Sequence, residues 1–455
     1  MTVICRPVHP DQPVTQNSMP AAAVEPRSFA RDQHSISRKH ISANALRVLY
    51  RLREAGFSGY LVGGAVRDLL IGREPKDFDV ATDATPEQCR QLFRNCRLIG
   101  RRFRLAHVMF GPEIIEVATF RANAAGDPEE DSEHVSESGR ILRDNVYGSI
   151  EDDAVRRDFT CNALYYTIED FSVRDFVGGF EDCRDRVLRL IGDPETRYRE
   201  DPVRMLRAAR LSAKLDFSIE PGSEAPIRSL GHLLGEASNA RLFDESQKLF
   251  LSGHGQASLA ALQRLGLLAV IMPDVHAALT SDTSGLCQQM LERAMANTDQ
   301  RVAEGKPVTP AYLFAALLWP VYAAGVQAMI AEGHALAVAE QRAADRAILR
   351  QCQHIAIPRR FSQQMEEIWF MQTRMQHRQR KRVMRLLAHP RFRAAYDFLE
   401  LRASIVPQLA DELAFWESMQ GEQRDVVLDA SGAPSGDGPR KPRRRRRKRT
   451  AASGG

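Results

Sequence analysis

The alternation of apolar and polar residues is clearest between residues 61 and 83. The apolar run that ends at Val62 has the pattern of a buried strand, and Gly63-Gly64 interrupts it. Residues 65–71 follow helical spacing, and the next apolar alternation, around Asp77 and Asp79, predicts a second strand. Because side chains alternate along a strand, we expect both aspartates on one face, about 7 Å apart.

Further elements of a small α/β unit flank this stretch. Ser42 is placed to cap a helix that ends before residue 56, and Thr85 with Gln88 forms a predicted capping box at the start of another. The runs 105–110 and 114–120 are spaced as two strands joined by a Gly-Pro turn. In the second run Glu116 lies on the face opposite to the apolar residues. It is interpreted either as a third carboxylate of the site or as an exposed residue at a strand edge.

The remainder of the chain is predicted to be mainly helical. Residues 155–167 are expected to form a helix with basic residues in its first turn. Residues 171–180 predict a short strand, which contains Asp175, and a turn at Gly178-Gly179. Further predicted helices cover 203–215, 239–251, 256–268, 311–330, 334–352, 361–377 and 391–402.

These patterns predict five consecutive parts. They are a disordered segment at 1–36, a catalytic head at 37–190, a helical neck at 191–270, a helical body at 271–420 and a disordered Arg/Lys-rich tail at 421–455.

Composition narrows the class of protein. The 455 residues contain 44% hydrophobic and 27% charged residues, which is ordinary for a globular protein. The seven cysteines are scattered without a C-x-x-C pair, so a structural zinc site or a disulfide framework is not expected. We expect no signal peptide and no membrane-spanning segment, and therefore a cytoplasmic protein.

Charge is concentrated at the C-terminus. The net charge is +5, and nine positive residues lie between 440 and 449, so the rest of the chain is mildly acidic. Such a run binds polyanions through their phosphates without reading sequence. RNA, the ribosome and an anionic membrane surface all remain open as its partner.

The chemistry is predicted at the two aspartates. An isolated D-x-D motif is more often a pair of solvated surface carboxylates than a catalytic site. Here it follows Gly63-Gly64, whose backbone can approach a phosphate closely, and the cation Arg67. Two carboxylates on one face repel each other, and a divalent cation between them relieves this repulsion. The combination predicts a site for Mg²⁺ and a nucleoside triphosphate.

The motifs LVGGAVRDLLIG and KDFDVATDATPEQ resemble those of the class II nucleotidyltransferases of the polymerase β superfamily. That group includes the tRNA CCA-adding enzymes and the bacterial poly(A) polymerases, and the resemblance covers about residues 40–270. It implies an α+β fold, with a polymerase β-like head followed by an elongated helical neck, body and tail.

The resemblance also implies roles for individual residues. Asp77 and Asp79 would bind two Mg²⁺ ions, with Mn²⁺ as a substitute, and Gly63, Gly64 and Arg67 would contact the triphosphate of ATP. The Arg156-Arg157-Asp158 motif would contact the ribose and phosphates, and the Glu200-Asp201-x-x-Arg204 motif would select the base. We expect Asp201 and Arg204 to brace each other at i and i+3 of one helix. Asp175 with Gly178-Gly179 would form a flexible element between head and neck.

Three features favour the poly(A) branch over the CCA-adding branch. Residues 144–166 resemble the bacterial poly(A) polymerase version of this region, residues 359–376 and 391–402 resemble its helical body, and the basic terminal run is typical of it. The predicted activity is template-independent addition of AMP to RNA 3′ ends, which marks RNA for decay. Two alternatives stay open: a CCA- or A-adding tRNA enzyme, and a catalytically silent RNA-binding protein.

RNA contacts are predicted in two basic segments. The candidate residues are Arg378, Arg380, Lys381, Arg382, Arg443, Arg444, Arg445, Arg446, Arg447, Lys448 and Arg449. The stretch Trp369, Phe370, Met371 and Met375 is interpreted as a helical core stripe in preference to a platform for primer bases. The chain is expected to act as a monomer, with RNA-decay proteins as partners.

Overall fold

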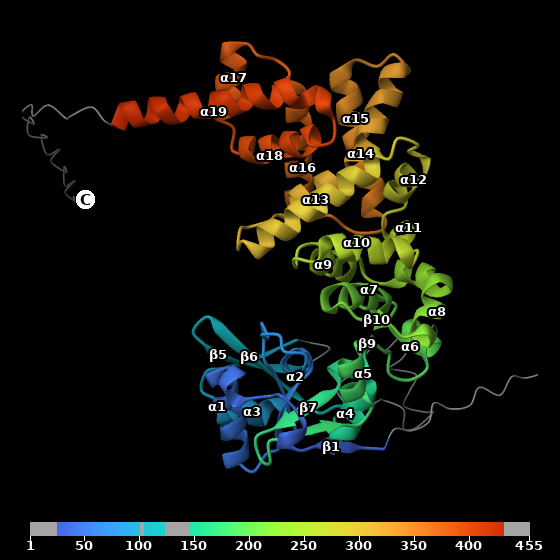
Figure 1. Cartoon of the computed structure of the whole chain (residues 1–455), viewed down its shortest axis with the longest axis vertical. Coiled ribbons are helices and arrows are strands. Elements are labelled where there is room, and N and C mark those ends of the chain that lie inside the picture. Colours follow the sequence, from blue (N-terminus) through green and yellow to red (C-terminus); the bar gives the residue numbers. More distant parts are fainter. Residues whose placement is uncertain (1–24, 101–103, 123–145, 432–455) are drawn as a thin grey trace, which may run out of the picture. The chain divides into compact units, whose positions relative to one another are not determined.

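The computed structural model describes residues 25–100, 104–122 and 146–431, with side chains to residue 421. Its head is built on an eight-stranded sheet of order β1-β8-β7-β2-β3-β6-β5-β4, in which all neighbours are antiparallel except β3 and β6 (Figure 1). The strands are β1 (Arg27–Phe29), β2 (Gly59–Val62), β3 (Asp79–Thr82), β4 (Cys96–Ile99), β5 (Leu105–Phe110), β6 (Glu113–Thr119), β7 (Leu164–Thr167) and β8 (Val173–Asp175).

Short helices pack against this sheet. They are α1 (Ala43–Glu54), α2 (Gly64–Leu70), α3 (Pro86–Leu92), α4 (Ile150–Arg156) and α5 (Gly179–Asp185). The predicted caps are confirmed: the Ser42 hydroxyl accepts from the N–H groups of Asn44 and Ala45, and Thr85 and Gln88 form a reciprocal capping box. These caps satisfy N–H groups that the first turn of a helix otherwise leaves unpaired.

The predicted helix over 155–167 is wrong. Helix α4 ends at Arg156, Arg157 is extended, and residues 164–167 form β7, in which all four residues are buried. The sequence Leu-Tyr-Tyr-Thr has high strand propensity, both edges of the strand are paired, with β2 and β8, and all four residues are buried, so both of its faces are covered. A strand buried on both faces has no polar alternation, so its apolar run is easily mistaken for part of a helix.

Disorder was predicted too broadly at both ends. Residues 27–29 form β1 and pair with β8, because an edge strand can recruit even a short polar segment. Residues 1–24 lie outside the described residues. At the other end, the backbone of α19 continues to residue 431, past the predicted start of the tail at 421.

Beyond the head, a two-stranded parallel sheet of β9 (Val187–Leu188) and β10 (Ser218–Ile219) precedes a helical array. The helices are α6 (Pro194–Glu200), α7 (Val203–Leu215), α8 (Pro221–Leu230), α9 (Asn239–Phe250), α10 (Gly255–Arg264), α11 (Leu268–Ile271), α12 (Pro273–Ser281), α13 (Leu286–Ala303), α14 (Pro310–Ala331), α15 (Leu336–Cys352), α16 (Arg359–Met375), α17 (Arg380–Leu387), α18 (Phe392–Ala403) and α19 (Ala410–Ser431). The expected fold class, an α/β head followed by helices, is confirmed.

Helix α14 corrects one expectation from the sequence. It is 22 residues long and apolar enough to cross a membrane by length and composition, which the sequence was not expected to contain. However, α14 packs against α12, α13 and α15 (Figure 1). Its residues Leu313, Phe314 and Leu317 are fully buried. The core helix of a globular protein can have the same length and apolar composition, so these two properties of α14 do not by themselves indicate a membrane span.

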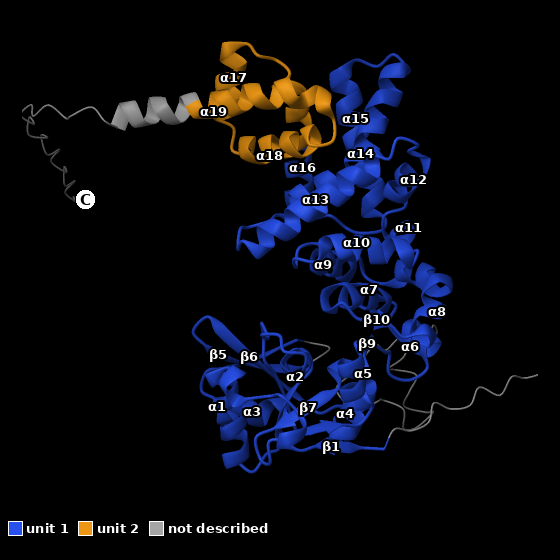
Figure 2. Cartoon of the chain, in the orientation of Figure 1, with its two compact units in different colours: residues 1–366 blue, residues 367–455 orange. Residues whose placement is uncertain are grey.

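The chain separates into two compact units, residues 1–366 and 367–455 (Figure 2). In the second unit Met371 and Met375 are buried in a core with Phe392, Tyr396 and Trp416. Trp369 is also buried, which confirms the interpretation of this stretch as core. The predicted boundaries near 190, 270 and 420 stay predictions.

Candidate active site

The pairing of β3 with β6 places two carboxylates next to each other. The parallel register sets Asp79, the first residue of β3, opposite Glu116. Asp77 lies two residues before β3, in its approach and not inside the strand as predicted. Asp77 and Asp79 are exposed, and the Glu116 side chain is 42% exposed and contacts the His107 ring at 3.2 Å. The third carboxylate expected from the sequence therefore lies beside the aspartates, while its role stays a prediction.

The electrostatics of this cluster favour a cation. Loss of hydration, and then the charge of Glu116, raise the pKa of Asp79 to about 6; Arg157 opposes the shift and Asp77 adds to it. A positive ion bound beside Asp79 would relieve this repulsion. Within the described ranges, no three His, Cys, Asp or Glu side chains are arranged as a metal cluster. Mg²⁺ commonly binds only one or two carboxylates and completes its coordination shell with phosphate and water. The pair Asp77 and Asp79 fits an ion of this kind.

Backbone approaches the same region at the start of α2. Gly63 has φ +73°, a backbone conformation that residues other than glycine rarely adopt, and it forms the N-cap of α2. A Cβ at Gly63 would lie 3.7 Å from Nη1 of Arg157, and one at Gly64 would lie 3.4 Å from Nη2 of Arg67. The two glycines therefore bring open backbone next to two guanidinium groups, a combination that suits phosphate.

Arg67 is held firmly in place. It is buried, it donates to Oδ1 of Asp68 from Nε at 2.9 Å and from Nη2 at 2.7 Å, and its Nη1 donates to Oδ1 of Asn162. Asn162 in turn donates to Asp158 at 3.2 Å. The sequence assigned Arg67 to the triphosphate, and that assignment stays a prediction. The structure shows that Arg67 is linked to Asp158 by hydrogen bonds through Asn162.

Asp158 connects the head to α7. Its carboxylate accepts from the N–H of Phe159 at 2.8 Å and from Nε of Arg207 at 2.7 Å, as well as from Asn162. Burial opposes ionisation, but the Arg207 guanidinium and these hydrogen bonds outweigh it and hold the pKa of Asp158 below its usual range. The neighbouring Arg157 donates to the Asp153 carboxylate and to the Tyr165 hydroxyl.

The expected brace between Asp201 and Arg204 is wrong. Asp201 is the C-cap of α6, with an extended backbone, and both of its oxygens accept from Arg241 of α9, at 3.0 and 2.8 Å. Arg204 instead donates to Glu200 at 3.0 Å and to the carbonyl of Arg197 at 2.7 Å. The i, i+3 spacing predicts contact only within a continuous helix, and here α6 ends before α7 begins.

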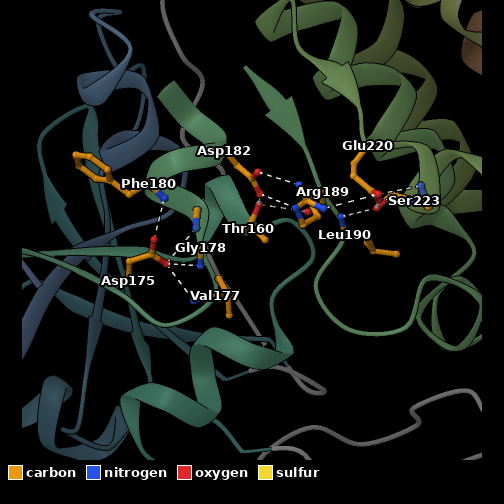
Figure 3. Close-up of polar contacts among 12 residues, drawn as sticks. Thr160, Asp175, Val177, Gly178, Phe180, Asp182, Arg189, Leu190, Glu220 and Ser223 are labelled. Atoms are coloured by element: carbon orange, nitrogen blue, oxygen red, sulfur yellow. Dashed lines mark hydrogen bonds and ion pairs between the residues drawn. The ribbon is translucent and has the colours of Figure 1, made fainter. Parts of the chain in front are cut away.

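The turn at Asp175 is confirmed, and Figure 3 shows its hydrogen bonds. The Asp175 carboxylate accepts from the N–H groups of Val177, Gly178, Gly179 and Phe180 at 2.9–3.1 Å. It thereby satisfies the donors at the start of α5. The expected flexibility of this element stays a prediction.

Figure 3 also shows a second set of contacts between the head and the first helices that follow it. The Thr160 hydroxyl and Nε of Arg189 both donate to the Asp182 carboxylate. Nη1 of Arg189 forms an ion pair with Oε1 of Glu220 at 3.7 Å. Glu220 accepts from Ser223, whose hydroxyl accepts from the N–H of Leu190 at 3.0 Å.

Sequence reasoning missed Asn162, Arg207 and Arg241. Arg207 follows Arg204 by three residues on one helix, a spacing that could have drawn attention to it. Asn162 likewise follows its partner Asp158 by four residues. Nothing in the local sequence marks Arg241, because its partner Asp201 lies 40 residues away and reaches it only through the fold.

The predicted RNA contacts divide into three groups. Arg378 lies over the Phe415 ring and donates to the carbonyl of Asp411 at 3.3 Å. Arg380, Lys381 and Arg382 are exposed on α17. Arg443–Arg449 lie outside the described residues.

Three models of protein families match segments of this chain. The poly(A) polymerase head domain model matches residues 59–189, the probable RNA and SrmB-binding site of polymerase A matches 216–279, and the polymerase A arginine-rich C-terminus matches 332–450. A poly(A) polymerase I of Salmonella typhimurium is 48% identical over 431 residues, which are 92% of this chain and 91% of that protein. The chain belongs to the poly(A) polymerase family. It is a nucleotidyltransferase, as the sequence predicted.

More distant relatives belong to the CCA-adding enzymes. The CCA-adding enzyme of Bacillus subtilis is 39% identical over 221 residues, which are 49% of this chain and 52% of that enzyme. The crystal structure of the Bacillus stearothermophilus CCA-adding enzyme in complex with CTP shares the fold, with a TM-score of 0.57, 24% identity, and coverage of 86% of this chain and 88% of that one. The poly(A) polymerase relatives match nearly the whole chain, so membership of that branch is better supported than the CCA-adding alternative.

Proposed function

We propose that this chain adds AMP from ATP to RNA 3′ ends without a template and releases pyrophosphate. The observation that carries the proposal is the register of β3 and β6, which sets Asp79 beside Glu116 with Asp77 two residues away. Two divalent ions bound there, Mg²⁺ or in its place Mn²⁺, would activate the primer hydroxyl and stabilise the leaving pyrophosphate.

Each group of residues has a separate task in this proposal. Asp77 and Asp79 hold the ions, and the backbone of Gly63 and Gly64 faces the triphosphate. Asp158, kept ionised by its contacts, accepts from the ribose hydroxyls. The base is selected by the Asp201 and Arg204 side chains, which Arg241 and Glu200 orient.

Selection of ATP without a template needs rigid donors and acceptors. A site built to hydrogen-bond one base rejects another because its buried polar groups are then left unpaired. Burial opposes ionisation of Asp201, but the hydrogen bonds and charge of Arg241, the charge of Arg204 and a backbone N–H outweigh it and hold the pKa of Asp201 below its usual range. The carboxylate therefore remains an acceptor throughout the neutral pH range.

The wider setting is part of the same proposal. The RNA is engaged by Arg380, Lys381 and Arg382 of α17 and by the basic segment 443–449. The protein acts in the cytoplasm as a monomer, alongside RNA-decay proteins. The basic segment also allows peripheral association with a membrane surface or the ribosome.

Primer extension tests the reaction. With Mg²⁺ and each nucleoside triphosphate separately, we expect long A-tracts on an unstructured RNA and little use of CTP. Addition that stopped after C, C and A, on a tRNA lacking its terminal CCA, would assign the CCA-adding reaction instead. No incorporation with either substrate would favour the silent RNA-binding protein.

Substitutions test the site. Asp77→Asn and Asp79→Asn should each lower incorporation by about a thousandfold or more, because neither amide can hold the ions. Asp216→Asn is the matched control, since the Asp216 side chain is 89% exposed and lies outside the proposed site. Normal turnover of Asp77→Asn or Asp79→Asn would overturn the metal assignment.

A further inference from the structure

Arg197 is a buried cation that neither the sequence motifs nor the proposed function has used. It lies on α6, and its side chain is 8% exposed. Burial and then the nearby Arg204 lower its pKa, although Glu200 opposes the shift. Keeping a guanidinium in such a place is costly unless its contacts are well made.

The contacts of Arg197 reach the ribose-binding motif of the head. Its Nη2 donates to the carbonyls of Arg156 and Arg157, both at 2.6 Å. These carbonyls lie at the end of α4, where the last carbonyls of a helix have no donor within the helix. A cation is also favoured there by the helix dipole. Arg197 therefore fixes the backbone from which the Asp158 carboxylate projects.

The other end of the same guanidinium reaches the base-reading motif. Nη1 of Arg197 donates to Oε2 of Glu200 at 2.7 Å, and the same oxygen accepts from Arg204 at 3.0 Å. Arg204 further donates to the backbone carbonyl of Arg197. One carboxylate oxygen is thus shared by two guanidinium groups, and a shift of Arg197 must move Arg204 as well.

The aliphatic part of the Arg197 side chain lies next to Gly192. Gly192, with φ +83°, has its missing Cβ position 3.6 Å from Cγ and Cδ of Arg197. A Cβ at that distance would make ordinary van der Waals contact with the arginine stem, so glycine is required at 192 by its left-handed backbone and not by crowding. The position of Arg197 between α4 and α6 is therefore set by its hydrogen bonds.

We propose that Arg197 is a positioning residue that sets the distance between the ribose-reading and base-reading groups of the nucleotide site. It touches neither ribose nor base, and it acts through the carbonyls of Arg156 and Arg157 on one side and through Glu200 on the other. In a nucleoside the distance between sugar and base is fixed. The selection of ribose over deoxyribose and the selection of adenine over other bases therefore both depend on Arg197. This inference rests on the proposed function of the same site.

The test compares Arg197→Met and Arg197→Lys with Arg199→Met in the full-length protein. Arg199 lies on the same helix, is exposed, and has no assigned role, so it controls for loss of a positive charge on α6. For each variant, kcat and KM are measured for ATP, dATP and CTP on the same unstructured RNA. Thermal unfolding is recorded in parallel to show that the variants are folded.

For Arg197→Met we expect ATP-over-dATP and ATP-over-CTP discrimination, each as a ratio of kcat/KM, to fall together by about ten- to a hundredfold. This is the change expected when charge-assisted hydrogen bonds to buried acceptors are lost. Arg197→Lys keeps one charge but cannot reach both acceptors at once, so it should restore only one of the two ratios. Arg199→Met should leave both unchanged.

The contrary results are distinct. Equal loss of activity with all three nucleotides, at unchanged ratios, would show that Arg197 only supports the fold. A change in only one ratio in Arg197→Met would show that the two motifs are set independently. Inactive wild-type protein would contradict the proposed function itself, whatever the variants do.

Discussion

At the scale of the residue, the charged neighbours of Asp79 distinguish it from Asp158. Its pKa is raised to about 6, whereas that of Asp158 is held low by Arg207 and by hydrogen bonds that outweigh its burial. The charge of Asp158 is balanced by groups of the protein, whereas Asp79 lies near carboxylates of the same charge. The fold therefore neutralises Asp158, and we expect a bound cation to neutralise Asp79.

The raised pKa predicts how stability depends on pH in the metal-free protein. A carboxyl whose folded-state pKa exceeds its unfolded value contributes stability at low pH, and this contribution is lost as pH rises from about 4 through about 6. In Asp79→Asn this loss is absent. Melting temperatures measured with EDTA between pH 4 and 8 should therefore fall more across this window for wild type than for the variant.

Two further results bear on that comparison. Excess Mg²⁺ should raise the melting temperature of wild type above pH 6 and leave that of Asp79→Asn nearly unchanged, since a ligand stabilises only the state that binds it. Parallel pH curves for the two proteins would contradict the assignment of the shift to Asp79.

At the scale of the element, the turn between β8 and α5 shows how two adjacent glycines serve different purposes. Gly178 has φ +84°, and a Cβ there would meet nothing within 4 Å. Gly179 has an ordinary backbone, but its Cβ would lie 2.1 Å from the carbonyl oxygen of Thr160. The first glycine is required by conformation, and the second by the close approach of α5 to residue 160.

Alanine substitutions should separate these purposes. Gly178→Ala should lower the free energy of unfolding by about 1–2 kcal/mol, the cost of a left-handed backbone. Gly179→Ala should cost about 3 kcal/mol or more, because the clash is with backbone and cannot be relieved by a rotamer change. Denaturant unfolding at one pH measures both, and equal losses would contradict the close approach.

At the scale of the whole molecule, positive charge is placed in segments that the catalytic head does not contain. Arg380, Lys381 and Arg382 are exposed on α17, and nine positive residues lie at 440–449. Contacts of this kind gain affinity from counterion release and fall steeply with salt. Such contacts do not read sequence, as the proposed substrate, an RNA defined mainly by its free 3′ end, requires.

The salt dependence of RNA binding measures these contributions. Changing Arg380, Lys381 and Arg382 to Gln should reduce the slope of log K against log salt by about 2, and removing residues 440–449 should reduce it by up to about 6. Gln at Arg47, Arg51 and Arg53, three exposed arginines of α1, is the control with the same charge change. Equal slopes for the α17 and α1 variants would remove α17 from the RNA-binding surface.

The sequence by itself determined what is local. Caps at Ser42 and Thr85, the strands around Glu116 and the turn at Gly178 each depend on a few consecutive residues, and all are found in the structure. The motifs likewise indicated the family, because their glycines and carboxylates lie close together in the chain.

Only the tertiary structure decided the partners that lie far apart in sequence. Pairing with β2 and β8 made residues 164–167 a strand, against the helical expectation. Asp201, the C-cap of α6, pairs with Arg241 of α9 instead of Arg204, and Asp158, just after α4, pairs with Arg207 of α7. A buried charge takes whichever partner the packing of the helices brings within reach, and the spacing of residues along one segment does not contain that information.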